Sequence, residues 1–145
     1  ATTMQALIAA GRDNLAGKVL LDIANPLDFS AGFPPTLFVK DTDSLAEQIQ
    51  REFPEAKVVK ALNTMTARLM VDPRQLADGE HTAFVSGDDL EAKRIVIALL
   101  NSFGHTDVID LGDITTARGT EMLLPAWVRL MGVLNTPYFN FKIVR

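Results

Sequence analysis

Four short apolar segments constrain the fold of this chain more than any other feature. They span 18–24, 57–62, 81–86 and 107–111, and each is followed by asparagine or glycine. Short, nearly continuous apolar runs of this kind are typical of strands covered on both faces in a parallel sheet. Helical patterns separate them. Strands alternating with crossovers predict an α/β fold with a doubly wound, mostly parallel sheet.

The connecting segments carry their own signals for helices and loops. Residues 4–10 and 44–53 have helical spacing, and the clearest helix is capped by residues 87–89 and ends at Gly104. Residues 114–134 resemble one long helix, which Pro125 should kink. The proline-rich and glycine-containing segment 25–37 is expected to be a loop. A last short strand is expected from Asn140 to Val144.

Composition excludes several classes of protein. The 145 residues fit one domain, and a net charge of −4 with scattered Lys and Arg argues against a nucleic-acid or anionic-membrane surface. There is no cysteine, hence no disulfide framework and no thiolate zinc site. No apolar run is long enough to span a membrane and no signal peptide is evident, so a cytoplasmic domain is expected.

The predicted topology indicates where a ligand would bind. Ligands of doubly wound sheets bind at the carboxyl ends of the strands. Three polar loops follow those ends, at 25–27, 63–65 and 86–88. Short polar groups at 63–65 could bond a ring amide or ribose, or could simply form an Asx or Thr turn.

Other chemistry finds little support. His81 and His105 lie at the entry ends of strands, opposite the expected ligand edge, and no cluster has metal-ligand spacing. No serine lies in a nucleophile elbow. The nine glycines form no phosphate-cradling motif, which argues against a complete dinucleotide-binding unit.

Three features leave more than one interpretation open. Asp22, late in a strand, could be the phospho-acceptor of a receiver domain, but a carboxylate bonded to nearby donors at the sheet edge is favoured. The polar run 110–121 suits a buried network or an interface as well as a ligand site. The apolar patch at 123–131 contains Trp127 and suits a core or a subunit interface, so a homodimer through the last helix is expected.

Three motifs together resemble one family. Val58–Met65, Ser86–Lys93 and Asp110–Arg118, the last followed by Glu121 and Pro125, occur in the order and spacing of the coenzyme F-420-dependent NADP oxidoreductases. The resemblance runs from about residue 6 to 144. It implies a Rossmann-type sheet that lacks its amino-terminal, glycine-rich half, so that residues 1–145 form a single domain, the carboxyl-terminal part of an NADP-binding oxidoreductase domain.

The resemblance also implies the function and its residues. The family transfers a hydride between NADP(H) and the deazaflavin F-420, and relatives use flavins; the alternative is a non-catalytic interaction module. Because both carriers supply the redox chemistry, the protein mainly orients two rings, and no acid–base residue is required. Small molecules are the expected partners. The implied cofactor-binding residues are Ala1, Thr2, Asn25, Pro26, Leu27, Asn63, Thr64, Met65, Leu124 and Phe139, with Asn63, Thr64 and Met65 positioning the two rings and Leu124 and Phe139 lining the deazaflavin pocket.

Overall fold

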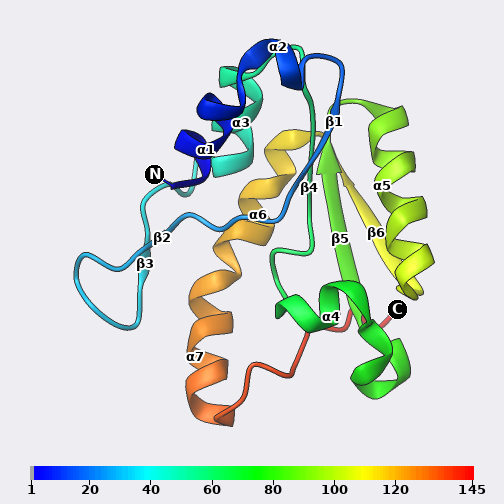
Figure 1. The fold of residues 1–145 in the computed structure, drawn as a ribbon. Helices are drawn as coiled ribbons and strands as arrows, with labels where there is room; N and C mark the ends of the chain where they lie inside the picture. Colours follow the sequence, from blue (N-terminus) through cyan, green and yellow to red (C-terminus); the bar gives the residue numbers. More distant parts are fainter. Residues whose placement is uncertain (1) are drawn as a thin grey trace.

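A four-stranded sheet forms the centre of the molecule (Figure 1). The structure, a computed structural model, describes residues 2–145. The strands lie in the order β1 (Val19–Asp22), β4 (Lys57–Ala61), β5 (Thr82–Gly87) and β6 (Asp107–Gly112), so β1 is an edge strand. The four apolar segments of the sequence therefore all form strands of one sheet.

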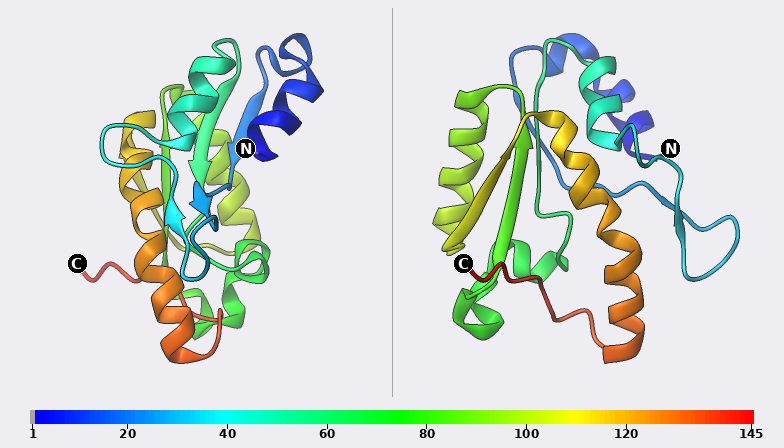
Figure 2. Two further views of the ribbon diagram at one scale, coloured as in Figure 1. Left: turned by 90° about the vertical axis from the view of Figure 1, so that its left-hand side faces the viewer. Right: turned by 180° about the vertical axis from the view of Figure 1, so that it is seen from behind.

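Helices and short turns connect and cover these strands. Within 25–37 the chain forms a small hairpin of β2 (Leu27–Asp28) and β3 (Thr36–Leu37), whose loop projects away from the main sheet (Figure 2). The remaining elements, in chain order, are α1 (Thr2–Ala10), α2 (Arg12–Leu15), α3 (Leu45–Glu52), α4 (Ala67–Val71), η1 (Pro73–Gln75), η2 (Ala77–Gly79), α5 (Leu90–Phe103), η3 (Ile114–Thr116), α6 (Ala117–Met122) and α7 (Leu124–Leu134).

The expected α/β fold with mostly parallel pairing is confirmed, with one reversed pair at its centre. β1 pairs with β4 and β5 with β6 in parallel, whereas β4 and β5 are antiparallel. The connection from β4 to β5 holds only the five-residue α4 and two 3-10 turns, so it contains no helix long enough to carry the chain back along the sheet. The chain enters β5 at the edge where β4 ends.

This reversal corrects one sequence-based prediction. Residues 86–88, at the end of β5, lie beside the beginning of β4, because Gly87 pairs with Val59. They are therefore at the edge opposite to residues 25–27 and 63–65. Only two of the three predicted ligand loops share an edge.

Alternating side chains along the strands build two cores, one on each face. Val59, Ala61 and Val85 pack with Val96 and Leu100 of α5 on one face. On the other face, Val58 packs with apolar residues of α3 and η3. Successive residues of a strand point to opposite faces, so the apolar strand β4 contributes Val59 to one core and Val58 to the other. The result is a three-layer domain (Figures 1 and 2).

The carboxyl-terminal third differs from the prediction in detail. The long helix is bent as expected, since α6 and α7 meet at Leu123 and Pro125 lies in the first turn of α7. The predicted strand from Asn140 to Val144 is wrong. That segment meets β5 only at its first residue, where Thr82 N donates to Phe141 O and Ile143 N donates to Thr82 Oγ1. Contacts with a single residue do not form the repeated backbone hydrogen bonds of a β-ladder.

Gly87 provides a test of how closely β5 approaches β4. A Cβ at this position would lie 2.9 Å from Val58 O, which is main chain and cannot rotate away. We expect Gly87→Ala to lower the free energy of unfolding by about 1–3 kcal/mol in urea titrations. Gly119→Ala is the matched control: nothing lies within 4 Å of its Cβ position, and alanine there should raise stability by about 0.5–1 kcal/mol. Equal effects would contradict this account.

Candidate functional site

Two asparagines join the adjacent ends of β1 and β4. Asn63 Nδ2 donates to Asn25 Oδ1 at 3.0 Å, and Asn25 Nδ2 donates to Asn63 O at 3.0 Å. Asn63 Nδ2 also donates to Thr120 O on α6 at 3.1 Å. The parallel pairing of β1 with β4 thus brings the two predicted loops together and attaches them to α6. Their role in binding stays a prediction.

The chain leaves β4 through an unusual backbone conformation. Leu62 has φ of 61°, in the left-handed region that bulky residues rarely adopt, and its side chain is buried. This turn directs Asn63, Thr64 and Met65 inward, where all three are buried. Met65 belongs to the core cluster with Leu69 and Val85. Local strain of this kind concentrates at functional sites and persists only where the surroundings hold it.

A buried ionic cluster lies next to this turn. Lys60 Nζ is 2.9 Å from Asp22 Oδ2 and 2.8 Å from Glu121 Oε1, and it also donates to Ala24 O. Lys60 and Glu121 are each 1% exposed and Asp22 5%. Buried charges are tolerated only when they are paired and hydrogen-bonded, as these are. The cluster connects β1, β4 and α6.

Glu121 extends this cluster to the beginning of α3. Its Oε2 accepts from Leu45 N at 2.8 Å and its Oε1 from Ala46 N at 3.1 Å. These are amides of the first turn of α3, where free N–H groups and the helix dipole favour a carboxylate. The Glu121 carboxylate therefore caps α3 and also partly neutralises the charge of Lys60.

A second pair reinforces the same helix terminus. Ser44 Oγ accepts from Glu47 N at 3.1 Å and donates to Glu47 Oε2 at 2.8 Å. Arg118 of α6 contacts both carboxylate oxygens of Glu47, and this bond is the main reason why the pKa of Glu47 lies below its ordinary value. α6 is thus held to α3 by two acidic residues.

Of the residues in this cluster, only Asp22 was predicted from the sequence to have a buried polar role. The favoured interpretation of Asp22 is supported, because Asp22 Oδ1 accepts from Ala24 N and Oδ2 contacts Lys60. A buried, paired carboxylate is poorly placed to accept a phosphoryl group. Lys60 offered a signal that could have been used: a lysine within an apolar strand must find a buried counter-charge.

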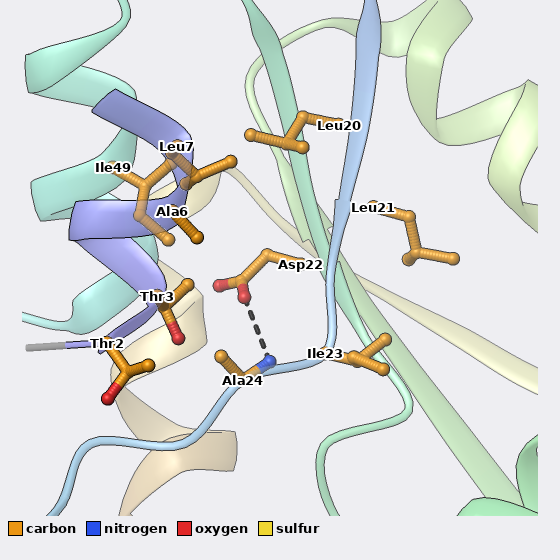
Figure 3. A pocket seen from close by; sticks show the side chains of 10 residues that line it. All are labelled: Thr2, Thr3, Ala6, Leu7, Leu20, Leu21, Asp22, Ile23, Ala24 and Ile49. Atoms are coloured by element: carbon orange, nitrogen blue, oxygen red, sulfur yellow. Dashed lines mark hydrogen bonds between the residues drawn. The ribbon is translucent and has the colours of Figure 1, made fainter. Parts of the chain in front are cut away.

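A largely apolar cavity of about 420 Å³ lies between α1 and the free edge of β1 (Figure 3). The hydroxyls of Thr2 and Thr3 and the carboxylate of Asp22 are its polar groups, and Leu20 and Ile49 are among its apolar ones. Ala24, the residue before Asn25, also lines it. The structure therefore places the predicted residue Thr2 next to the predicted loop 25–27. Ala1, predicted with Thr2, lies outside the described residues.

The remaining predicted residues lie near this edge, on α7 or in the segment that follows α7. Pro26 is fully buried, and Leu27 begins the small hairpin. Leu124 is buried at the start of α7, whereas Phe139 stacks on Trp127 with ring centroids 5.1 Å apart. The predicted dimer through α7 stays a prediction; Val133 and Leu134 are exposed there.

Residues 86–88 and the first part of the run 110–121, up to Thr116, form a polar network at the opposite edge. Thr116 Oγ1 donates to Ser86 Oγ at 2.8 Å, and Ile114 N donates to Asp88 Oδ1 at 3.0 Å. Lys93 Nζ contacts Asp110 Oδ1 at 2.9 Å. Of the interpretations offered for this run, the structure supports the polar network.

The two histidines are buried together rather than exposed. Their rings lie 6.1 Å apart, and each Nε2 is within 3.1 Å of a main-chain carbonyl, of Pro73 for His81 and of Met70 for His105. Since β5 is reversed, both lie at the edge where β4 ends, so the prediction of the opposite edge is wrong. Burial lowers the pKa of His105, and the nearby His81 adds to this effect.

Within residues 2–145, no group of three His, Cys, Asp or Glu side chains is arranged to hold a metal ion. No helix in the same part of the chain has the length and apolar character needed to cross a membrane.

Comparison with known proteins identifies relatives that are described as reductases. The crystal structure of a candidate F-420-dependent NADP reductase from Arthrobacter sp. FB24 superimposes with a TM-score of 0.97 and 68% identity over 99% of the chain. The F-420-dependent NADP reductase of Methanocaldococcus jannaschii is 32% identical over 120 residues, 82% of the chain. The chain is homologous to the F-420-dependent NADP reductases. The metalloreductase STEAP3 of Rattus norvegicus is 36% identical over 79% of the chain.

The chain corresponds to only part of each relative. It spans 53% of the M. jannaschii reductase, 22% of the metalloreductase and 65% of the Arthrobacter chain. No protein-family model matches it.

Lys60 provides the test of the buried cluster. Lys60→Met removes the cation that lies between two buried carboxylates, and we expect the free energy of unfolding to fall by about 3–5 kcal/mol. Lys57→Met is the control, because Lys57 is on the same strand but its ion pair with Asp89 is partly exposed, so the expected loss is below about 1 kcal/mol. Chemical denaturation of both variants makes the comparison; similar losses would disprove the role assigned to Lys60.

The lowered pKa of His105 predicts that the stability of the fold depends on pH. Its folded pKa lies below the ordinary value of 6.5, so the unfolded state binds a proton more readily. The free energy of unfolding should therefore decrease as pH falls below 6.5, with a slope of at most about 1.4 kcal/mol per pH unit for one proton. His105→Gln should flatten this part of the curve in thermal unfolding between neutral and mildly acidic pH. An unchanged slope would contradict the prediction.

Proposed function

We propose that the protein carrying this chain transfers a hydride between NADP(H) and the deazaflavin coenzyme F-420 or a related flavin-type acceptor. The observation that carries the proposal is the homology, 68% identity over 99% of the chain, to a structure described as a reductase of this kind. The homology to the F-420-dependent NADP reductase of M. jannaschii further supports the proposal.

The geometry of the β1–β4 edge suits the task of orienting rings. Nicotinamide and deazaflavin supply the redox chemistry themselves, and the protein has to hold them in register. The cavity beside β1 has the apolar lining and the few polar groups typical of a site for a flat ring, and its volume of about 420 Å³ lies in the usual range. We infer that Thr2, Asn25, Pro26 and Leu27 lie against the nicotinamide.

The neighbouring residues would form the other half of the site. Asn63, Thr64 and Met65 are assigned to the junction of the two rings, and Leu124 and Phe139 to the wall of the deazaflavin pocket. Asn63 would act chiefly by fixing Asn25, since its amide is engaged with Asn25 and Thr120. The assignment requires no proton donor. Lys60 and Asp22, which bond to the main chain of Ala24 just before Asn25, are paired with one another.

The decisive experiment uses the full-length protein. NADPH should be oxidised when F-420 is added, with loss of the NADPH absorbance and bleaching of the deazaflavin. FMN and FAD are tested in parallel as alternative acceptors. Absence of turnover with all of them would refute the proposal and leave the non-catalytic interaction module as the better hypothesis.

Thr2 tests the nicotinamide side of the site. Thr2→Val keeps the shape of the side chain and removes one hydroxyl from the cavity. We expect the KM for NADPH to rise roughly two- to tenfold, the worth of one hydrogen bond, with little change in unfolding. Thr42→Val is the control, because Thr42 is exposed in the turn before α3 and does not line the cavity. Equal KM values would remove Thr2 from the site.

A further inference from the structure

We infer that a second pocket, between β3 and the junction of α6 with α7, binds the acidic side chain of the deazaflavin coenzyme. The inference rests on the proposed function and adds to it a subsite and two specificity-determining residues, Lys40 and Arg129. The ligand chemistry is a phosphodiester or carboxylate attached to a flat ring.

The pocket has a lining that favours such a group. Its volume is about 360 Å³, and its charged residues are Lys40, which follows β3, and Arg129 of α7. Thr36 adds a hydroxyl, and none of the residues that line the pocket is acidic. Two cations without a carboxylate form a site of positive potential in a chain whose net charge is −4.

Both cations are available to a ligand. Within residues 2–145, no ion pair or side-chain hydrogen bond engages Lys40 or Arg129 in the way that Arg51 engages Asp43 or Arg118 engages Glu47. An arriving anion would gain charge-assisted hydrogen bonds without first displacing an internal partner.

The pocket adjoins both halves of the predicted ring site. On one side, Leu37 in the pocket wall pairs with Leu27 in the small hairpin. On the other side, Pro125 in the wall directly follows Leu124. A substituent that extends from a ring held between Leu27 and Leu124 would enter the pocket.

The walls are built from residues of restricted conformation. Pro34 and Pro35 form the hairpin side and Pro125 the helix side, and the ring of each proline fixes its backbone φ. Pro35 is also buried, which holds the hairpin against the rest of the domain. A preformed pocket loses less entropy when it binds than a mobile one.

The deazaflavin is favoured over NADP as the source of the anion. Its side chain carries a phosphodiester and carboxylates, whereas the phosphates of NADP are expected at a glycine-rich turn, a motif that the nine glycines of this sequence do not form. Three residues of the pocket, Met122, Pro125 and Arg129, come from α6 and α7, and Leu124 is the first residue of α7. The alternative, NADP phosphates in this pocket, is an outcome of the test.

The test compares two deazaflavins in the full-length protein. F-420 has the acidic side chain, and its riboflavin-like precursor has the same ring without phosphate or glutamate. For the double variant Lys40→Ala, Arg129→Ala, we expect the KM and Kd for F-420 to rise about three- to tenfold, with kcat and the values for the precursor unchanged. The difference should disappear at about 1 M salt, where charges are screened within about 3 Å.

Matched controls separate the pocket from a general effect of charge. Lys18→Ala removes an exposed cation at the far end of β1 and should leave all constants unchanged, and Arg129→Lys should retain most of the affinity. Equal changes for both deazaflavins, or a change confined to NADPH, would overturn this inference while the proposed function stands. Wild-type protein that neither binds nor reduces either deazaflavin would overturn the proposed function and this inference together.

Discussion

The contact of Lys60 with Asp22 and Glu121 is the interaction on which the rest of this structure depends. A lysine that is 1% exposed in the middle of a strand would be strongly destabilising without counter-charges. The need for those charges fixes β1, which carries Asp22, and α6, which carries Glu121, against β4. Because Glu121 also accepts from the first amides of α3, the position of that helix follows from the same cluster.

The buried ionic cluster also holds the residues of the candidate site in place. Lys60 donates to Ala24 O, and Ala24 directly precedes Asn25, while Asn63 follows β4 by two residues and bonds to both Asn25 and Thr120. β1, β4 and α6 are thus joined twice, once by charges and once by amides. The proposed hydride transfer between two rings would depend on their alignment more than on chemical groups of the protein. The two sets of contacts between β1, β4 and α6 would keep such rings in a fixed position.

The sequence predicted the elements better than their directions and partners. The apolar runs identified all four strands of the sheet, because burial on two faces leaves a local pattern. The antiparallel pairing of β4 with β5 has no such pattern, since it depends on how a connection folds at the end of the sheet. The partners of Lys60 lie far along the chain, 38 residues away in the case of Asp22, and no local periodicity reveals them. The meeting of Asn25 with Asn63 was predictable, because parallel neighbours end at the same edge.

The reversed strand also explains how the far edge of the sheet contributes to the site. It places Ser86 and Asp88 beside the turn that begins α6, where they bond to Thr116 and to Ile114 N. That turn sets the start of the helix whose next residues are Arg118, Thr120 and Glu121, which reach Glu47, Asn63 and Lys60. A parallel β5 would have carried Ser86 and Asp88 to the ligand edge and left the start of α6 without these partners. Ser86 and Asp88 therefore influence the candidate site indirectly, because they fix the start of α6 and α6 contacts the site residues.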